Sequence, residues 1–178
     1  MCIGFYVLCF FWVQFGAGDC GTDGRCRALT LTLITNYLTH HTRFLAEALY
    51  DRLGGGFHWI ETAPLRPERI ALGWRREPDR PYLLRSYEEK AALCRQLALE
   101  SDVVVLGSGS DRWIGPRLRR GRLTFRYAER WYKTGLPPAA RVRAWLHHGR
   151  FQRAPLYLLC AGAYVAADAA WAGCYRDK

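Results

Sequence analysis

The sequence predicts an α/β domain built on a parallel sheet, and two patterns indicate it. From residue 28 onward, short aliphatic runs alternate with stretches that carry apolar residues at helical spacing. The run Val103–Leu106 is apolar throughout, as expected of a strand that is covered on both faces. Strands separated by helices predict right-handed crossovers between parallel neighbours.

Each expected element has its own local signal. The expected strands are residues 29–34, 57–61, 82–84, 103–106, 123–127 and 156–160. The expected helices are residues 42–53, 67–72, 88–100, 138–153 and 161–171. In the first of these helices, Leu45, Leu49 and Leu53 recur every four residues, and three glycines then end it. In the third helix, Leu93 and Leu97 are expected to face the core.

The composition favours an anionic partner. Lys and Arg number 26 against 16 Asp and Glu, which gives a net charge of +10. Such an excess suits a nucleic acid, an anionic membrane surface or a phosphorylated ligand. Half of the 178 residues are hydrophobic and 14% are aromatic, so collagen-like, coiled-coil and low-complexity classes are excluded.

The seven cysteines indicate reduced thiols in the cytoplasm. No two of them form a Cys-x-x-Cys pair and their number is odd, which disfavours both a zinc site and a disulfide framework. Cys94 and Cys160 stand in apolar stretches, where we expect them to pack as small hydrophobic side chains.

The first 26 residues are set apart from the domain expected over 27–178. Residues 1–18 carry no charge, whereas a secretory signal normally opens with Lys or Arg. The stretch is short for a membrane helix, and the arginines at 25 and 27 would keep the following chain on the cytoplasmic side of an inserted one. A membrane anchor, a cleaved signal and an incidental leader stay open, and we favour the leader.

Ligands of open parallel sheets bind beyond the carboxyl ends of the strands, and polar residues follow the first expected strand. Asn36, His40 and His41 stand just before a helix amino terminus, which favours hydroxyl or phosphate ligands. The alternative is structural: Thr39 or Thr42 caps the helix while one histidine is solvated.

The strand over 103–106 is followed by a second candidate, which contains Ser108 and Ser110. The flanking glycines at 107 and 109 allow a backbone to approach a phosphate or a sugar closely. The segment lacks both the dinucleotide fingerprint and the P-loop, and it is not a serine-hydrolase elbow. A simple tight turn is the alternative.

A third candidate, Arg126, Glu129 and Arg130, lies at the end of the next strand. These residues could form an ion pair that leaves one arginine for a phosphate, or they could be solvated surface. His147 and His148 are expected to face solvent, and a metal site between the two histidine pairs is disfavoured.

Several segments together resemble bacterial glycosyltransferases of polysaccharide synthesis, of the family 4-like GT-B type. They are residues 35–41 (TNYLTHH), 61–64 (ETAP), 68–74 (ERIALGW), 81–85 (PYLLR), 123–131 (LTFRYAERW) and 155–161 (PLYLLCA). The resemblance spans residues 29–178 and implies the amino-terminal half of a GT-B enzyme, a Rossmann-like parallel sheet flanked by helices. In that family a second such domain holds most of the nucleotide-sugar donor, and this one holds most of the acceptor.

The resemblance implies sugar transfer from a nucleotide-sugar donor to a polysaccharide or lipid-linked acceptor, with no cofactor or metal. Under this hypothesis the residues after the first strand line the acceptor side, and the two serines bind a sugar. The two arginines and Glu129 would then shape the diphosphate end. The family continues into its donor-binding domain where this chain ends at Lys178, so we expect little turnover by this chain alone.

The competing hypothesis is a basic α/β module, without catalysis, that binds nucleic acid or an anionic membrane. Nucleic acid is disfavoured because no recognised binding motif accompanies the charge. We expect a cytoplasmic protein, with the inner face of the plasma membrane as a docking surface for its basic face.

Overall fold

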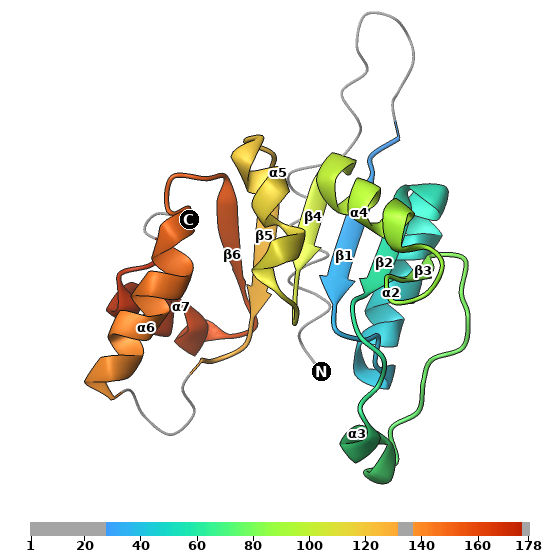
Figure 1. Cartoon of the computed structure of the whole chain (residues 1–178), viewed down its shortest axis with the longest axis horizontal. Helices are drawn as coiled ribbons and strands as arrows, with labels where there is room; N and C mark the ends of the chain where they lie inside the picture. The colour runs from blue at the N-terminus through green and yellow to red at the C-terminus, as the bar shows by residue number, and fades with distance from the viewer. Residues whose placement is uncertain (1–27, 132–136, 176–178) are drawn as a thin grey trace, which may run out of the picture.

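A computed structural model describes residues 28–131 and 137–175 of the chain (Figure 1). The leader expected over residues 1–26 therefore lies outside the described residues. Among the residues that are described, no helix combines the length and the apolar character needed to cross a membrane.

Six parallel strands form one sheet in the order β3-β2-β1-β4-β5-β6 (Figure 1). The strands are β1 (Leu31–Thr35), β2 (Phe57–Glu61), β3 (Leu83–Arg85), β4 (Val103–Leu106), β5 (Thr124–Ala128) and β6 (Leu156–Cys160). The chain adds strands on one side of β1 and then on the other, so the direction of winding reverses between β1 and β4. The domain is a Rossmann-like α/β lobe, as the sequence predicts.

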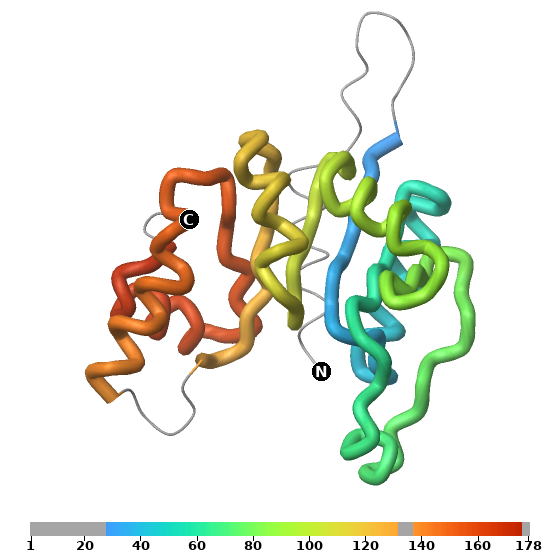
Figure 2. Tube along the Cα trace, viewed as in Figure 1, coloured from blue at the N-terminus to red at the C-terminus, as the bar shows by residue number. Residues whose placement is uncertain are grey.

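Helices cover both faces of this sheet. They are α2 (His40–Leu53), α3 (Pro67–Ala71), α4 (Ala91–Glu100), α5 (Gly115–Arg119), α6 (Pro138–His148) and α7 (Ala163–Ala172). Three short 3-10 turns complete the set: η1 (Gly54–Gly56), η2 (Asp111–Trp113) and η3 (Gly149–Phe151). Helix α2 lies behind the sheet in Figure 1, and α4 and α5 lie in front of it. The tube in Figure 2 shows the chain leaving β1, β2, β4 and β5 at the lower edge.

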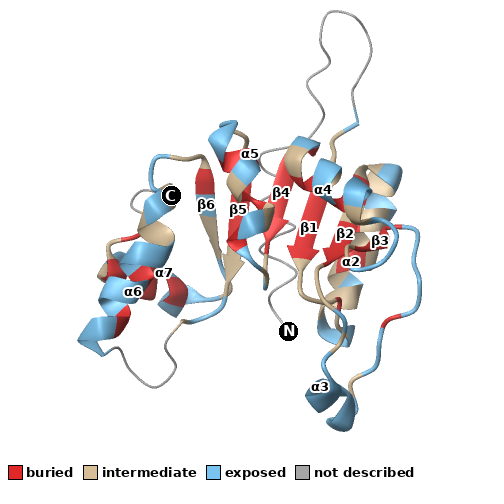
Figure 3. Cartoon of the chain, viewed as in Figure 1, coloured by how far each residue is buried: buried red, intermediate tan, exposed pale blue. Residues whose placement is uncertain are grey.

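Alternate side chains of the central strands enter two separate cores. Figure 3 shows that the buried residues are concentrated in the central strands. The core under α2 contains Leu31, Leu33, Phe57, Trp59, Val103 and Val105 of the sheet, with Ala46 and Leu49 of the helix. The core under α4 and α5 contains Ile34, Ile60, Val104 and Leu106, with Cys94, Ala98 and Leu118. Because both faces of β4 are covered, its sequence has no polar position.

The ends of α2 follow from local chemistry. Thr39 precedes the helix, and its backbone N–H donates to the Thr42 hydroxyl at 3.2 Å. The helix therefore begins at His40, two residues before the expected start, and both histidines lie in its first turn. At the other end Gly54 takes a φ of 52°, in the left-handed region that favours glycine, which confirms the predicted stop.

Two side chains predicted to be buried are exposed. Leu93 is 43% exposed because Cys94 and Ala98, four residues apart, form the face of α4 that packs on the core. Cys160 is exposed at the last position of β6, an edge strand with a neighbour on one side only. Cys94 is buried, as predicted.

The sequence patterns missed α5, and they made α6 too long. The inward face of α5 carries Arg117, which is fully buried and donates to the carbonyl oxygens of Leu123 and Asp102 at 2.6 and 2.8 Å. Burial lowers the pKa of Arg117 to about 10. A helix anchored by a cation lacks the apolar spacing that sequence patterns detect. Helix α6 ends at His148 and continues as a 3-10 turn, because glycine at 149 weakens the helix.

Replacing Leu106 of β4 and Leu93 of α4 by Ala compares a core position with a surface position. Leu106 is fully buried, so the cavity should lower the free energy of unfolding by about 2–5 kcal/mol. The matched change Leu93→Ala should lower it by less than about 1 kcal/mol, since that side chain is on the surface. Urea denaturation of both variants measures the difference, and equal losses would contradict the observed facing of α4.

Candidate functional site at the carboxyl edge of the sheet

The loops after β1 and β4 touch at the point where the winding reverses. The backbone N–H of Asn36 donates to the Ser108 hydroxyl at 3.2 Å. Gly107 permits this approach, because a Cβ there would stand only 3.0 Å from the Thr35 methyl group. The structure thus brings two separately predicted site segments into direct contact at the reversal point, the place at which open α/β sheets bind ligands.

A third loop joins them through Thr62, which directly follows β2. Its hydroxyl donates to the Asn36 side-chain carbonyl oxygen at 3.3 Å, and its backbone N–H donates to the carbonyl oxygen of Thr35 at 2.9 Å. Asn36, Thr62 and Ser108 form one polar group, called here the edge triad. Sequence reasoning did not name Thr62 as a site residue, although it is the first residue after an expected strand.

Aromatic side chains gather beside the edge triad. The rings of His40 and His41 lie 3.8 Å apart, and their centroids lie 5.8 and 6.3 Å from that of Trp74. Tyr37 meets the same indole edge-on at 6.1 Å, and the Arg69 guanidinium lies 4.8 Å from its centroid. Both histidines are exposed, so this aromatic cluster is a surface that a ligand can reach. Trp74 lies in a loop, where no periodic pattern marks it.

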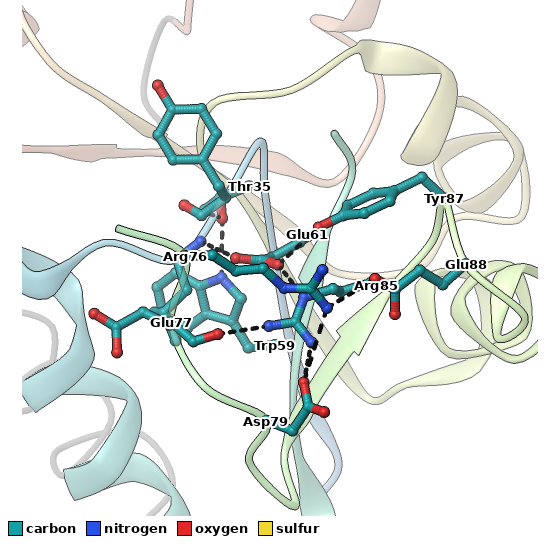
Figure 4. A network of polar contacts seen from close by, with 11 residues as sticks. Thr35, Trp59, Glu61, Arg76, Glu77, Asp79, Arg85, Tyr87 and Glu88 are labelled. Atoms are coloured by element: carbon teal, nitrogen blue, oxygen red, sulfur yellow. Dashed lines mark hydrogen bonds and ion pairs between the residues drawn. The ribbon is translucent and has the colours of Figure 1, made fainter. Parts of the chain in front are cut away.

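Glu61 holds the loop that carries these groups (Figure 4). It is the last residue of β2 and is 2% exposed. One carboxylate oxygen accepts the backbone N–H of Leu38 at 2.7 Å, just before α2 begins. The other accepts from Arg85 Nε at 2.9 Å and from the Tyr87 hydroxyl at 3.3 Å. The loop between β1 and α2 is therefore tied to a buried ion pair.

Arg85 is buried too, and its other donors are also used. They reach the Glu77 carbonyl oxygen at 2.7 Å and the Asp79 carboxylate (Figure 4). Burial alone would lower the pKa of Arg85, but Asp79 and Glu61 outweigh it and raise the pKa. Burial and the nearby Glu61 charge raise the pKa of Tyr87, which keeps this hydroxyl a donor.

The predicted residue Arg126 lies in the middle of β5 rather than at its end, and it is buried there with its guanidinium against the Asp111 carboxylate. Asp111 also contacts Arg150, and His147 Nε2 lies 3.5 Å away. Burial by itself would raise the pKa of Asp111, but the hydrogen bonds and charges of Arg126 and Arg150 lower it overall. Ser110 lies next to this group, where its hydroxyl accepts the backbone N–H of Arg112 at 3.4 Å and caps η2.

Arg130 and Glu129 are exposed just beyond β5. The carboxylate near Arg130 is that of Asp168 on α7, at 3.7 Å, and the guanidinium lies 4.8 Å from the Tyr164 ring centroid. The carboxylates that contact Arg126 and Arg130 thus come from η2 and α7, which local sequence could not place. Glu129 reinforces burial in raising the pKa of Tyr127.

No family model, curated protein or solved structure matches this chain. In the described part of the chain, no group of three or more His, Cys, Asp or Glu residues could hold a metal ion.

The prediction that His148 faces solvent is wrong. Its ring stacks on Trp131 with centroids 4.3 Å apart and planes 5° from parallel, and Nδ1 lies 3.2 Å from the Tyr175 hydroxyl. Burial, with the positive charges of Arg126 and His147, lowers the pKa of His148 to about 3. His147, by contrast, has an exposed side chain.

Glu61→Gln should show that the buried charge holds the edge. Glutamine keeps an acceptor for the Leu38 N–H but removes the negative charge beside Arg85, so the free energy of unfolding should fall by about 3 kcal/mol. Glu88→Gln, which breaks the exposed pair with Arg76, should cost less than about 1 kcal/mol. Urea denaturation compares the two, and a Glu61→Gln loss as small as that of Glu88→Gln would contradict the assigned role.

His148 should make stability depend on pH. The unfolded chain binds a proton at this position below about pH 6.5, whereas the folded chain does so only near pH 3. The free energy of unfolding should therefore fall as the pH drops from 7 to 5. The fall should be smaller in His148→Phe, which keeps a ring against Trp131. Denaturation at both pH values tests this, and an equally steep fall in the variant would contradict it.

Proposed function

We propose that this lobe binds the acceptor in a glycosyltransferase that moves a sugar from a nucleotide-sugar donor to a polysaccharide or lipid-linked acceptor. The observation that carries the proposal is the contact of Asn36 with Ser108 and Thr62 at the reversal point, beside the exposed aromatic cluster. The segments that resemble polysaccharide glycosyltransferases supply most of these residues.

The chemistry of this edge suits a sugar. Sugar hydroxyls are both donors and acceptors, and the edge triad offers two hydroxyls and an amide that can serve in both ways. A sugar ring also has a C–H face, which packs against aromatic rings such as Trp74 and the two histidines. A neutral imidazole adds one donor and one acceptor at the same surface.

The lobe's part in catalysis would be positioning. Glycosyl transfer requires a positioned acceptor hydroxyl and stabilisation of the departing diphosphate. The edge triad and His41 would hold the acceptor. Of the two predicted arginines, Arg130 is the better placed to meet a diphosphate, since its side chain is 41% exposed and Arg126 is buried against Asp111.

Sugar binding to residues 1–178 can be measured directly by NMR titration with p-nitrophenyl hexosides. Chemical shift changes should cluster at the loops after β1, β2 and β4. Ser108→Ala and His41→Ala should each weaken the tightest hexoside roughly 2- to 10-fold through a lost hydrogen bond. Arg52→Ala, an exposed change at the far end of the same helix as His41, should leave the affinity unchanged.

Two results would contradict the proposal. One is an absence of binding across the glucosides, galactosides and mannosides of the panel. The other is binding whose shift changes lie away from the edge triad and whose affinity Ser108→Ala leaves intact. Titration with a nucleotide sugar in parallel separates an acceptor role from a donor role, since we expect only weak donor binding by these residues.

A further inference from the structure

Helix α6 exposes an apolar stripe. Val142, Trp145 and Leu146 are 58%, 52% and 61% exposed, and their spacing of three and four residues puts them on one face. The opposite face carries the buried Ala140 and Ala144, which attach the helix to the rest of the domain. The stripe is therefore the outward side of a helix that is held firmly from behind.

The charge around this stripe has one sign. Residues 130–167 contain six Arg or Lys residues and no Asp or Glu. Four of these cations, Arg141, Arg143, Arg150 and Arg153, are exposed on α6 or in the segment just after it. The acidic groups that contact cations here, Asp111 and Asp168, are buried and come from other elements.

The indole of Trp145 packs on the backbone of its own helix, and about half of the side chain is exposed. It lies across Gly149, where a Cβ would stand 3.5 Å from the ring. Arg141 lies 5.5 Å from the Trp171 ring centroid, which keeps its guanidinium beside α7. An exposed tryptophan between flanking arginines is the arrangement that membrane-surface helices use at the lipid headgroups.

We propose that α6 docks the protein on an anionic lipid bilayer. Val142, Trp145 and Leu146 would enter the boundary between headgroups and acyl chains, and the exposed arginines would contact lipid phosphates. The inference uses none of the sugar-binding residues, so it holds or fails independently of the proposed function. In Figure 1, α6 lies beyond β6, the edge strand of the sheet at the opposite end from β3.

The apolar stripe favours lipid over nucleic acid as the partner. Exposed arginines serve a phosphate backbone as well as they serve lipid phosphates. The side chains of Val142 and Leu146, however, gain nothing from a phosphate backbone, whereas in a bilayer they leave water. Of the two partners, only the bilayer makes favourable contacts with both the arginines and the apolar stripe.

Cosedimentation of the full chain with phosphatidylcholine vesicles, with and without phosphatidylglycerol, tests the proposal. Binding should be stronger to the anionic vesicles and should weaken as salt is added. Each arginine near the surface contributes roughly fivefold to partitioning, so R143Q/R153Q should bind anionic vesicles roughly 25-fold more weakly. The control R52Q/R95Q removes the same charge from exposed positions on α2 and α4 and should change binding far less.

The apolar side chains have a test of their own. V142S/L146S should weaken binding to anionic vesicles at least severalfold, and L93S, at an exposed leucine of α4, should not. In protein labelled with fluorotryptophan, the resonance that W145F removes should broaden when spin-labelled lipid is added. Thermal melting of every variant checks that it is folded. We expect all of them to fold, because the substituted side chains are exposed.

The apolar residues 1–18 are the same in every variant, so differences between variants arise at the substituted positions. Binding by R143Q/R153Q and V142S/L146S equal to that of the wild type would overturn the proposal. So would full competition by a single-stranded oligonucleotide with V142S/L146S binding as the wild type does, since the patch would then be a nucleic-acid surface.

Discussion

A single buried carboxylate organises the edge of this domain. Glu61 ends β2 at a buried position, where an unpaired charge would be strongly unfavourable. Arg85 neutralises it from the neighbouring strand, and the remaining acceptor capacity goes to the Leu38 N–H and the Tyr87 hydroxyl. Because Leu38 stands between β1 and α2, this pair fixes where Asn36 and the histidine turn lie.

A comparable device stabilises the other half of the edge. Asp111 forms ion pairs with Arg126 of β5 and Arg150 of η3. These pairs connect the segment after β4 to the elements that follow it. Glu61 ends a strand and Asp111 follows one, and each carboxylate pairs with an arginine of another element. The two ion pairs thus hold the loops on either side of the reversal point.

These pairs also decide which positive charges stay available. Arg85 and Arg126 contribute to the net charge, but both are buried in ion pairs and do not belong to an exposed binding surface. The cations on the outside of α6 have no acidic residue near them in sequence, and they surround exposed apolar side chains. The positive charge is therefore spread unevenly, with part of it buried and part gathered on α6 and the segment just after it.

Local sequence patterns were enough to predict the α/β class, the parallel sheet and the polar loops at its edge. They also placed most strands to within a residue or two. These features depend on local periodicity, on apolar runs and on glycines at turns, which act over a few residues. The sequence named Asn36, Ser108 and the two histidines, because they directly follow apolar runs.

Only the tertiary structure decided which of those residues meet. Thr62 meets Asn36 across the sheet edge, Trp74 reaches the histidines from the connection after α3, and the partners of Arg126 and Arg130 come from η2 and α7. The facing of Leu93, the exposure of Cys160 and the burial of Arg117 likewise depend on packing between distant elements. Ion pairing and close packing act across space, between residues that the order of the chain keeps apart, so no local pattern could reveal them.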